Sequence, residues 1–333
     1  MAATGSATWR QRGRPLGGNG VGHCSRRSQA VRPVADATGT LPPMSVSSPQ
    51  ELAARLAEAH YLCDDGLAVG MYLALQMHRP LLLEGEPGVG KTEAAKALAT
   101  VLGADLIRLQ CYEGIDASQA LYEWDYSRQL LHARAIQDGA LDQDARVQEL
   151  FSEKFLVARP LLQAIRAGSK AVLLIDELDR ADDEFEAFLL EVLSDFAITI
   201  PEVGTIRATE PPAVIITSNR TRELHDALKR RCLYHWLEYP SIEREVAIIR
   251  LRVPEAEPVL AGAVADAVAR LRQMDLAKPP GPAEAIDWTR ALHLVGAPPI
   301  DEASANDTLG WVVKNREDQD RIGADLARVI GLA

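Results

Sequence analysis

The stretch 83-LEGEPGVGKTEAAKALA-99 fills the spacing G-x-x-x-x-G-K-[ST] of a phosphate-binding loop without a gap. A short apolar run closed by glycine, 80-PLLLEG-85, precedes the loop, and a helical pattern follows at 93–102. A buried strand, a glycine-rich loop and a helix in this order distinguish a phosphate-binding loop from a chance match. These residues therefore predict a nucleotide-binding α/β fold.

The loop residues have separate expected roles toward a bound nucleotide. Backbone N–H groups of 88–92 can point at the phosphates, helped by the N-terminus of the following helix. We expect Lys91 to reach the β- and γ-phosphates and the Thr92 hydroxyl to bind Mg²⁺. The predicted nucleotide-binding residues are Gly85, Glu86, Pro87, Gly88, Val89, Gly90, Lys91 and Thr92.

A second apolar strand, 171-AVLLIDE-177, ends in two acids. At this position Asp176 can hold Mg²⁺ through water, so Asp176 and Thr92 are the predicted metal residues. Glu177 can act as the general base on an attacking water, which favours hydrolysis over binding alone. The alternative is a solvated acidic pair that caps the next helix, and the upstream loop makes this alternative much weaker.

Three further polar residues are candidates for catalysis. Asn219 ends the apolar strand 213–218, where it could orient the water or sense the γ-phosphate, although Asn is also a common turn former. Arg230 and Arg231 could supply an arginine finger to a neighbouring subunit. They could equally stabilise the C-terminal turn of a helix, and the residues alone do not decide between these roles.

The order of patterns predicts two folded domains. Apolar strands alternate with helices up to about residue 239, which indicates a parallel sheet covered on both faces. The run 197–208 is typical of a β-hairpin that turns at 202–204. After Pro240 only helical patterns occur, at 241–252, 259–274 and 283–295. We therefore predict a nucleotide-binding domain at 48–239 and an all-helical lid domain at 240–333, with loop and solvated helix ends at 303–307 and 314–320.

The composition narrows the class of protein. The formal net charge is −11 at pH 7, so we expect no nucleic-acid partner, which would need a basic surface. No apolar run approaches the roughly 18 residues of a membrane span. The cysteines are scattered without disulfide or metal spacing, which predicts reduced thiols in a cytoplasmic protein.

Residues 1–43 differ from the rest of the chain, with six arginines, one acid and no apolar period. Such a segment cannot bury enough apolar surface to become ordered. Its composition is that of a transit peptide or a basic arm. We favour a third interpretation, in which this segment is an upstream extension of the reading frame and Met44 is the effective start. Organised sequence begins just after Met44, with a capping box at Ser48 and Glu51. Residues 1–47 are therefore expected to be disordered or non-native.

Taken in order, these segments resemble the MoxR family of AAA+ ATPases from about residue 48 to the end. The resemblance rests on GEPGVGKT (85–92), LLIDELDRADDEFEAFLLEVL (173–193), TIPEVGTIRA (199–208), IITSN (215–219) and ALKRRCLYHWLEYPS (227–241). The segments YEGIDASQALYEWDY (112–126) and PAEAIDWTRAL (282–292) are most similar to the branch associated with carbon monoxide dehydrogenase maturation.

The resemblance implies an ATP-hydrolysing chaperone that uses Mg²⁺ and forms a ring, typically a hexamer. It also implies a partner with a von Willebrand factor A domain and, for this branch, a metalloenzyme client. Asn219 becomes sensor 1, Arg231 the first choice of finger and Arg230 the reserve. The hairpin 198–207 would face the pore or the target.

One position departs from the family pattern. The family has a sensor arginine in a Ser-Pro-Arg stretch at the start of a lid helix, whereas this chain has Glu284 in the matching Pro-Ala-Glu. Arg290 lies nearly two turns later and is a possible substitute. The departure favours a second interpretation, an ATP-dependent switch or scaffold with low turnover. A third, a nucleic-acid motor, is disfavoured by the acidic charge.

Overall fold

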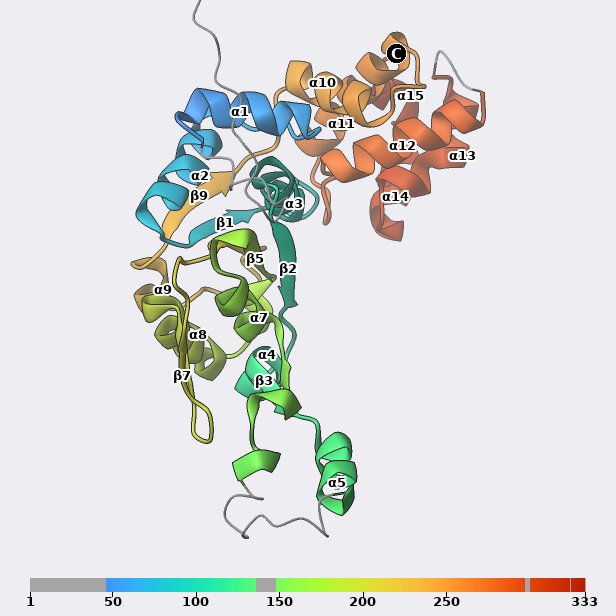
Figure 1. Ribbon diagram of the computed structural model, residues 1–333. Helices are drawn as coiled ribbons and strands as arrows, with labels where there is room; N and C mark the ends of the chain where they lie inside the picture. The colour runs from blue at the N-terminus through green and yellow to red at the C-terminus, as the bar shows by residue number, and fades with distance from the viewer. Residues whose placement is uncertain (1–45, 136–147, 297–299, 324, 333) are drawn as a thin grey trace, which may run out of the picture. The chain divides into compact units, whose positions relative to one another are not determined.

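The computed structural model describes residues 46–135, 148–296, 300–323 and 325–332 (Figure 1). The predictions for residues 1–43 and for Met44 lie outside this part of the chain. The larger sheet has the order β2-β5-β8-β1-β9, and all its neighbouring strands are parallel. This confirms the predicted fold class. Its strands are β1 (Leu81–Gly85), β2 (Asp105–Gln110), β5 (Ala171–Asp176), β8 (Ala213–Ser218) and β9 (Leu233–Leu237).

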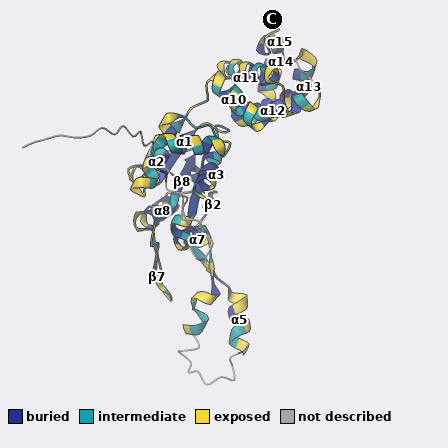
Figure 2. Cartoon of the chain, turned by 45° about the horizontal axis from the view of Figure 1, so that its top comes forward, coloured by how far each residue is buried: buried dark blue, intermediate teal, exposed yellow. Residues whose placement is uncertain are grey.

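Helices cover both faces of this sheet. Successive side chains along the strands point to opposite faces, and on each face they form a hydrophobic core together with side chains of the covering helices. Leu81, Leu83 and Leu174 pack in the core that contains residues of α1 (Pro49–Glu58), α2 (Asp65–Met77) and α3 (Lys91–Leu102). Leu82, Leu173 and Ile216 pack in the core that contains residues of α7 (Pro160–Ala167) and α8 (Asp183–Asp195). Figure 2 shows that the strands of this sheet are largely buried.

The strand order places the candidate site at one edge of the sheet. The phosphate-binding loop follows β1, the acidic pair ends β5, and Asn219 follows β8. These three strands are adjacent and parallel, so their carboxyl ends meet at the same edge. Ligands of open α/β sheets bind outside such an edge.

Two smaller antiparallel sheets lie outside the main one. The predicted hairpin is present as β6 (Ala197–Ile200) and β7 (Gly204–Arg207). The other pair, β3 (Tyr122–Trp124) and β4 (Leu156–Ala158), has no counterpart among the elements predicted from the sequence. The remaining elements here are α4 (Ala117–Leu121), α5 (Tyr126–Ala135), η1 (Glu153–Phe155), η2 (Gly168–Lys170), η3 (Leu178–Arg180) and α9 (Asp226–Lys229).

The C-terminal region is helical and has a hydrophobic core of its own, centred on the fully buried Trp288. Its elements are α10 (Ile242–Arg252), α11 (Pro258–Gln273), α12 (Pro282–Leu294), α13 (Glu302–Val312), α14 (Arg316–Gly323) and α15 (Leu326–Val329). The separate core is compatible with a lid domain from residue 240, and this boundary stays a prediction.

Two predicted loop and end segments of this region are structured. Residues 303–307 lie inside α13, because Asp301 caps its start (2.7 Å from its Oδ1 to the Ser304 N) and Ala305 and Leu309 are buried. Within 314–320, Asp318 is only 1% exposed, since its carboxylate accepts the backbone N–H groups of Ala277 and Lys278. The prediction of loop at 303–307 was therefore wrong, whereas 314–320 are a loop and the mostly exposed start of α14, as predicted, with the exception of the buried Asp318.

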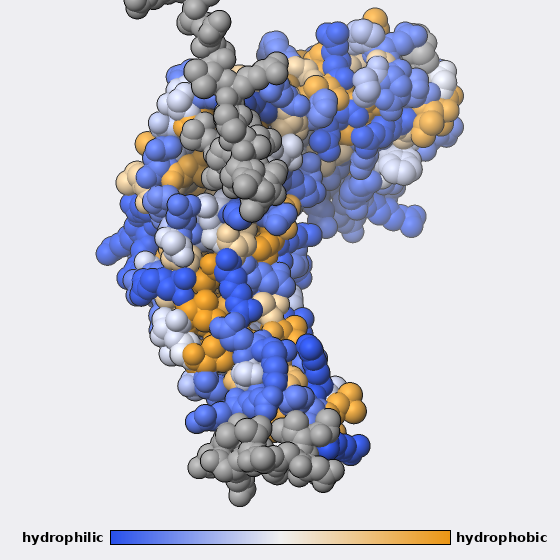
Figure 3. All heavy atoms as spheres, in the orientation of Figure 1, coloured by the Kyte–Doolittle hydropathy of each residue, from blue (hydrophilic) through white to orange (hydrophobic). Residues whose placement is uncertain are grey.

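The surface is mainly polar on the face drawn in Figure 3, where hydrophobic side chains gather only in smaller groups. Within the described ranges, no helix combines the length and the apolar character needed to cross a bilayer.

Candidate nucleotide-binding and hydrolysis site

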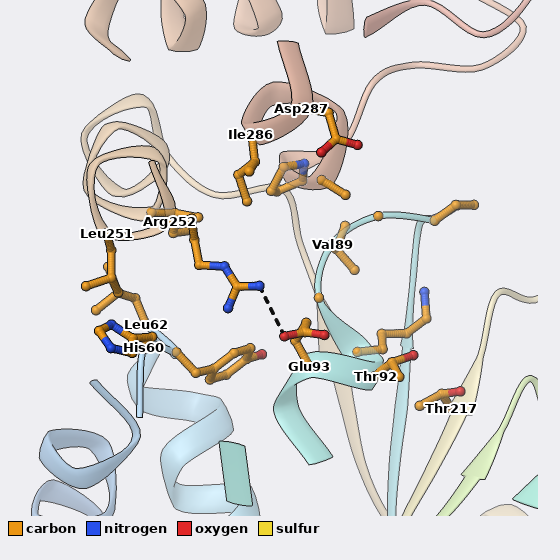
Figure 4. A pocket seen from close by; sticks show the side chains of 18 of the residues that line it. His60, Leu62, Val89, Thr92, Glu93, Thr217, Leu251, Arg252, Ile286 and Asp287 are labelled. Atoms are coloured by element: carbon orange, nitrogen blue, oxygen red, sulfur yellow. Dashed lines mark hydrogen bonds and ion pairs between the residues drawn. The ribbon is translucent and has the colours of Figure 1, made fainter. Parts of the chain in front are cut away.

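A cavity of about 440 Å³ lies at the carboxyl edge of the sheet. Its wall combines the phosphate-binding loop, residues 60–62 and the two acids at the end of β5 with residues of α10 and α12. Figure 4 shows Val89 and Thr92 on one side, and Leu251, Arg252 and Ile286 opposite them. The volume lies within the range of small-molecule and cofactor sites.

Lys91 is folded onto its own loop. Its Nζ donates to the carbonyl oxygens of Gly85 (2.7 Å) and Glu86 (2.9 Å). Burial lowers the pKa of Lys91 to about 8, although nearby carboxylates, Asp179 first among them, act in the opposite direction. The loop itself requires glycine at position 85, where a Cβ would lie 2.5 Å from the Leu237 carbonyl oxygen.

Thr92 and Asp176 lie together, as the sequence predicts. The Thr92 hydroxyl donates to the Asp176 carboxylate, at 3.1 Å from Oδ1 and 3.3 Å from Oδ2. Asp176 is 2% exposed, and its Oδ1 also accepts the Thr217 hydroxyl at 2.6 Å. The Arg108 guanidinium donates to Oδ2 from Nε (2.9 Å) and Nη2 (2.6 Å). A buried carboxylate thus meets two hydroxyls and one cation.

This donor set fits Mg²⁺, which prefers oxygen ligands and is usually held by one or two carboxylates together with phosphates and water. The hydroxyl of Thr92 and the carboxylate of Asp176 are the groups that would hold it. When bound, Mg²⁺ would neutralise charge on the phosphate oxygens.

Glu177 directly follows β5 and lines the cavity. Its backbone is left-handed (φ 55°), and its N–H donates to the Thr217 hydroxyl at 2.9 Å. Its Oε2 accepts the Gln110 side-chain amide at 3.2 Å and the Arg180 guanidinium at 3.4 Å. The side chain is therefore held by polar neighbours beside the loop, where it can act on a water.

Asn219 lines the same cavity, whereas Arg230 and Arg231 do not. Both arginine side chains are exposed, and their backbone carbonyls accept the Arg79 guanidinium at 2.7 and 3.0 Å. They line a second hollow of about 360 Å³ together with apolar residues of α8. The single chain therefore does not bring either arginine to Glu177.

The start of α12 contacts the phosphate-binding loop. The Ala283 N–H donates to the Gly88 carbonyl at 3.3 Å, and Glu284 accepts the Gly281 N–H at 2.9 Å. A Cβ at Gly88 would lie 2.7 Å from Glu284 Oε2, so an acid sits against the loop where the family resemblance implies an arginine. Arg290 also lines the cavity and donates to the Arg252 carbonyl at 3.1 Å.

Three polar residues at this site are absent from the sequence prediction: Arg108, Gln110 and Thr217. Arg108 and Gln110 alternate on β2, opposite Leu174 and Asp176 of β5, so their side chains share one face with the acid. The signal that could have identified them is the alternation of polar side chains in β2, the strand next to the one that ends in the acidic pair. Thr217 carried no comparable signal because it directly follows the apolar residues 213–216 and is read as part of the same buried strand.

Comparisons with known proteins show which sequences this chain is similar to. Residues 80–232 match the family model of the AAA domain, dynein-related subfamily. The chain is 29% identical over 170 residues to the uncharacterized protein YehL of Escherichia coli, covering 48% of this chain and 42% of that one. It is 25% identical over 206 residues to the uncharacterized protein YeaC of Bacillus subtilis, covering 59% and 55%. The chain thus spans about half the length of these relatives.

Among solved structures, the RuvB Holliday junction branch migration motor of Thermotoga maritima aligns with 20% identity and a TM-score of 0.45, covering 76% of this chain and 69% of that one. The family match covers the loop, both acids and Asn219 within one continuous range. Residues 80–232 of this chain are therefore similar to the AAA domain of the dynein-related subfamily.

Proposed function

We propose that this protein hydrolyses ATP with Mg²⁺ and uses the energy to remodel a partner protein. The observation that carries the proposal is the cavity in which Lys91 and Thr92 meet Asp176 and Glu177. Lys91 would bind the phosphates, Thr92 and Asp176 would hold the metal, and Glu177 would take the proton of the attacking water. Asn219 would orient that water from the end of β8.

The active form is a ring in which each site is completed by a neighbour. Arg231 is the proposed finger and Arg230 the reserve, because both are exposed and neither lines the cavity of its own chain. Either of these two arginines would therefore stabilise transition-state charge only in the cavity of a neighbouring subunit. A hexamer follows from the resemblance to the MoxR family.

The client class rests on the sequence resemblance alone. Segments 112–126 and 282–292 favour a role in the maturation of a metalloenzyme of the carbon monoxide dehydrogenase type. A partner with a von Willebrand factor A domain belongs to the same proposal. The hairpin of β6 and β7 is the element proposed to contact the target.

A second candidate function is an ATP-dependent switch or scaffold with low turnover. The contact of Glu284 with Gly88 favours it, because a carboxylate at the loop cannot stabilise the γ-phosphate as an arginine would.

ATP turnover per subunit, measured with Mg²⁺ across a wide range of protein concentration, separates the two functions. Because the finger comes from a neighbour, we expect turnover per subunit to rise steeply with concentration and then reach a plateau. Glu177→Gln is the control, which should bind ATP and hardly turn it over. Slow turnover that does not depend on concentration would contradict the ring-forming remodeller and favour the switch.

A further inference from the structure

We propose that Arg108 is a positioning residue that competes with Mg²⁺ for Asp176. Its guanidinium donates to the carboxylate that the metal would use. This inference rests on the proposed function, because it concerns the metal of the ATP site. It assigns to an exposed side chain of the edge strand β2 a role that the phosphate-binding loop and acidic-strand motifs do not include.

The charge of Asp176 needs a cation when no metal is bound. The carboxylate is 2% exposed, and a buried charge without a partner is strongly destabilising. Lys91 does not serve as the partner, since its ammonium donates to the Gly85 and Glu86 carbonyls. Within the described ranges, Arg108 makes the only ion pair with Asp176, at 2.6 Å.

The geometry makes this cation a competitor of the metal. Both donors of Arg108 point at Oδ2, while Thr217 donates to Oδ1, so the carboxylate's acceptor positions are largely filled. A metal, or a water bound to it, requires one of those positions. Thr217 is buried and also holds the Glu177 backbone, whereas the Arg108 side chain is 50% exposed. Arg108 is therefore the partner that can leave toward solvent.

The same guanidinium is connected to the proposed base, Glu177, through the side chain of Gln110. Arg108 Nη2 donates to the Gln110 side-chain oxygen, and the Gln110 amide donates to Glu177 Oε2 at 3.2 Å. Departure of Arg108 from Asp176 thus releases one end of the chain of hydrogen bonds that holds Glu177. Metal arrival and the orientation of Glu177 are linked through this one residue.

The test is the binding of a fluorescent ADP analogue, mant-ADP, to the full chain in excess Mg²⁺ and in excess EDTA. The ratio of the two Kd values measures how strongly Mg²⁺ promotes binding. Because Arg108→Gln removes the competing cation, this ratio should rise about three- to tenfold, a modest change because the pair is half exposed. Arg108→Lys, which keeps the charge with fewer directed donors, should fall between the two.

Arg159→Gln is the matched control, because Arg159 is a similarly exposed arginine paired with Glu123 and does not line the cavity. It should leave the ratio unchanged. An unchanged ratio in Arg108→Gln would overturn the inference. So would a loss of mant-ADP affinity in EDTA, since that result means that Arg108 binds the phosphates.

A measurement on the unmutated chain covers the case in which Arg108→Gln does not fold. In ¹⁵N-arginine-labelled protein bound to ADP, addition of Mg²⁺ should shift the Nε–H resonance of Arg108, and an unmoved resonance would overturn the inference. Failure of the unmutated protein to bind mant-ADP would instead contradict the proposed function, so the two failures are distinguishable.

Discussion

Lys91 makes nucleotide binding sensitive to pH. Burial lowers its pKa to about 8, whereas phosphates beside it would favour the protonated ammonium. The complex then holds a proton that the free protein has lost above pH 8. Affinity for mant-ADP should be level just below pH 8 and fall above it, by at most about tenfold per pH unit.

The measurement is a series of mant-ADP titrations from pH 7.5 to 9.5. Lys91→Arg is the control, because a guanidinium stays protonated throughout this range and should give a level profile. A level profile for the unmutated protein would show that Lys91 keeps its proton in the ligand-free state.

At the residue scale, the sequence identifies candidate groups that the structure brings together, and it misses the residues that hold them in place. Thr92 and Asp176 meet as expected because their motifs fix both the residue type and the end of the strand. Arg108 escapes prediction because its partner lies 68 positions away, on a strand whose neighbour is known only after the sheet is assembled. The roles of Asn219, Arg230 and Arg231 stay predictions.

At the scale of elements, α10 and α11 are joined by a buried ion pair. Arg272 donates to both oxygens of Glu245 at 2.7 Å, and Glu245 is fully buried. Arg272→Ala would leave this carboxylate without a partner, so we expect a loss of about 3–5 kcal/mol in the free energy of unfolding of the helical region. Urea unfolding followed by circular dichroism measures the loss.

Arg250→Ala, a change at an exposed arginine of α10, should cost less than about 0.5 kcal/mol and serves as the matched control. The double change Arg272→Met with Glu245→Leu should recover most of the stability, because it removes the buried charge together with its partner. An equally large loss in the double variant would assign the effect to packing rather than to charge.

Sequence patterns identify elements with strong periodicity and fail for short ones. β1, β5 and β8 are predictable because each is an apolar run next to a recognisable motif. β3 and β4 have three residues each and are separated by more than thirty positions, so no turn signal joins them. α13 looks polar in sequence because its four buried residues, Ala305, Thr308, Leu309 and Val312, alternate with exposed ones.

At the scale of the whole molecule, the position of Arg231 predicts cooperation between subunits. Arg231 is exposed and does not line the cavity of its own chain. Arg231→Ala should therefore bind mant-ADP normally and lose ATP turnover by about 10³-fold or more, the scale of a finger supplied in trans. Turnover and binding are measured on the same preparation.

ATP turnover by a mixture of two inactive variants tests whether Arg231 acts in a neighbouring subunit. Arg231→Ala subunits keep an intact loop, and Lys91→Ala subunits keep an intact arginine, so mixed rings should regain turnover that neither variant shows alone. Arg230→Ala is the matched neighbour and should retain most of its turnover. Normal turnover by Arg231→Ala would assign the role to another residue.

The contact between α12 and the phosphate-binding loop has a mechanical consequence. A Cβ at Gly281 would lie 2.9 Å from the Pro87 carbonyl oxygen, so the two backbones touch with no side chain between them. Such a joint transmits displacement directly, because neither backbone can shift toward the other without pushing it. Any change in the backbone of the loop at Pro87 and Gly88 must therefore tilt the first turn of α12. The orientation of the helical region would then depend on the conformation that a bound nucleotide gives the loop, and not on the charge of the nucleotide.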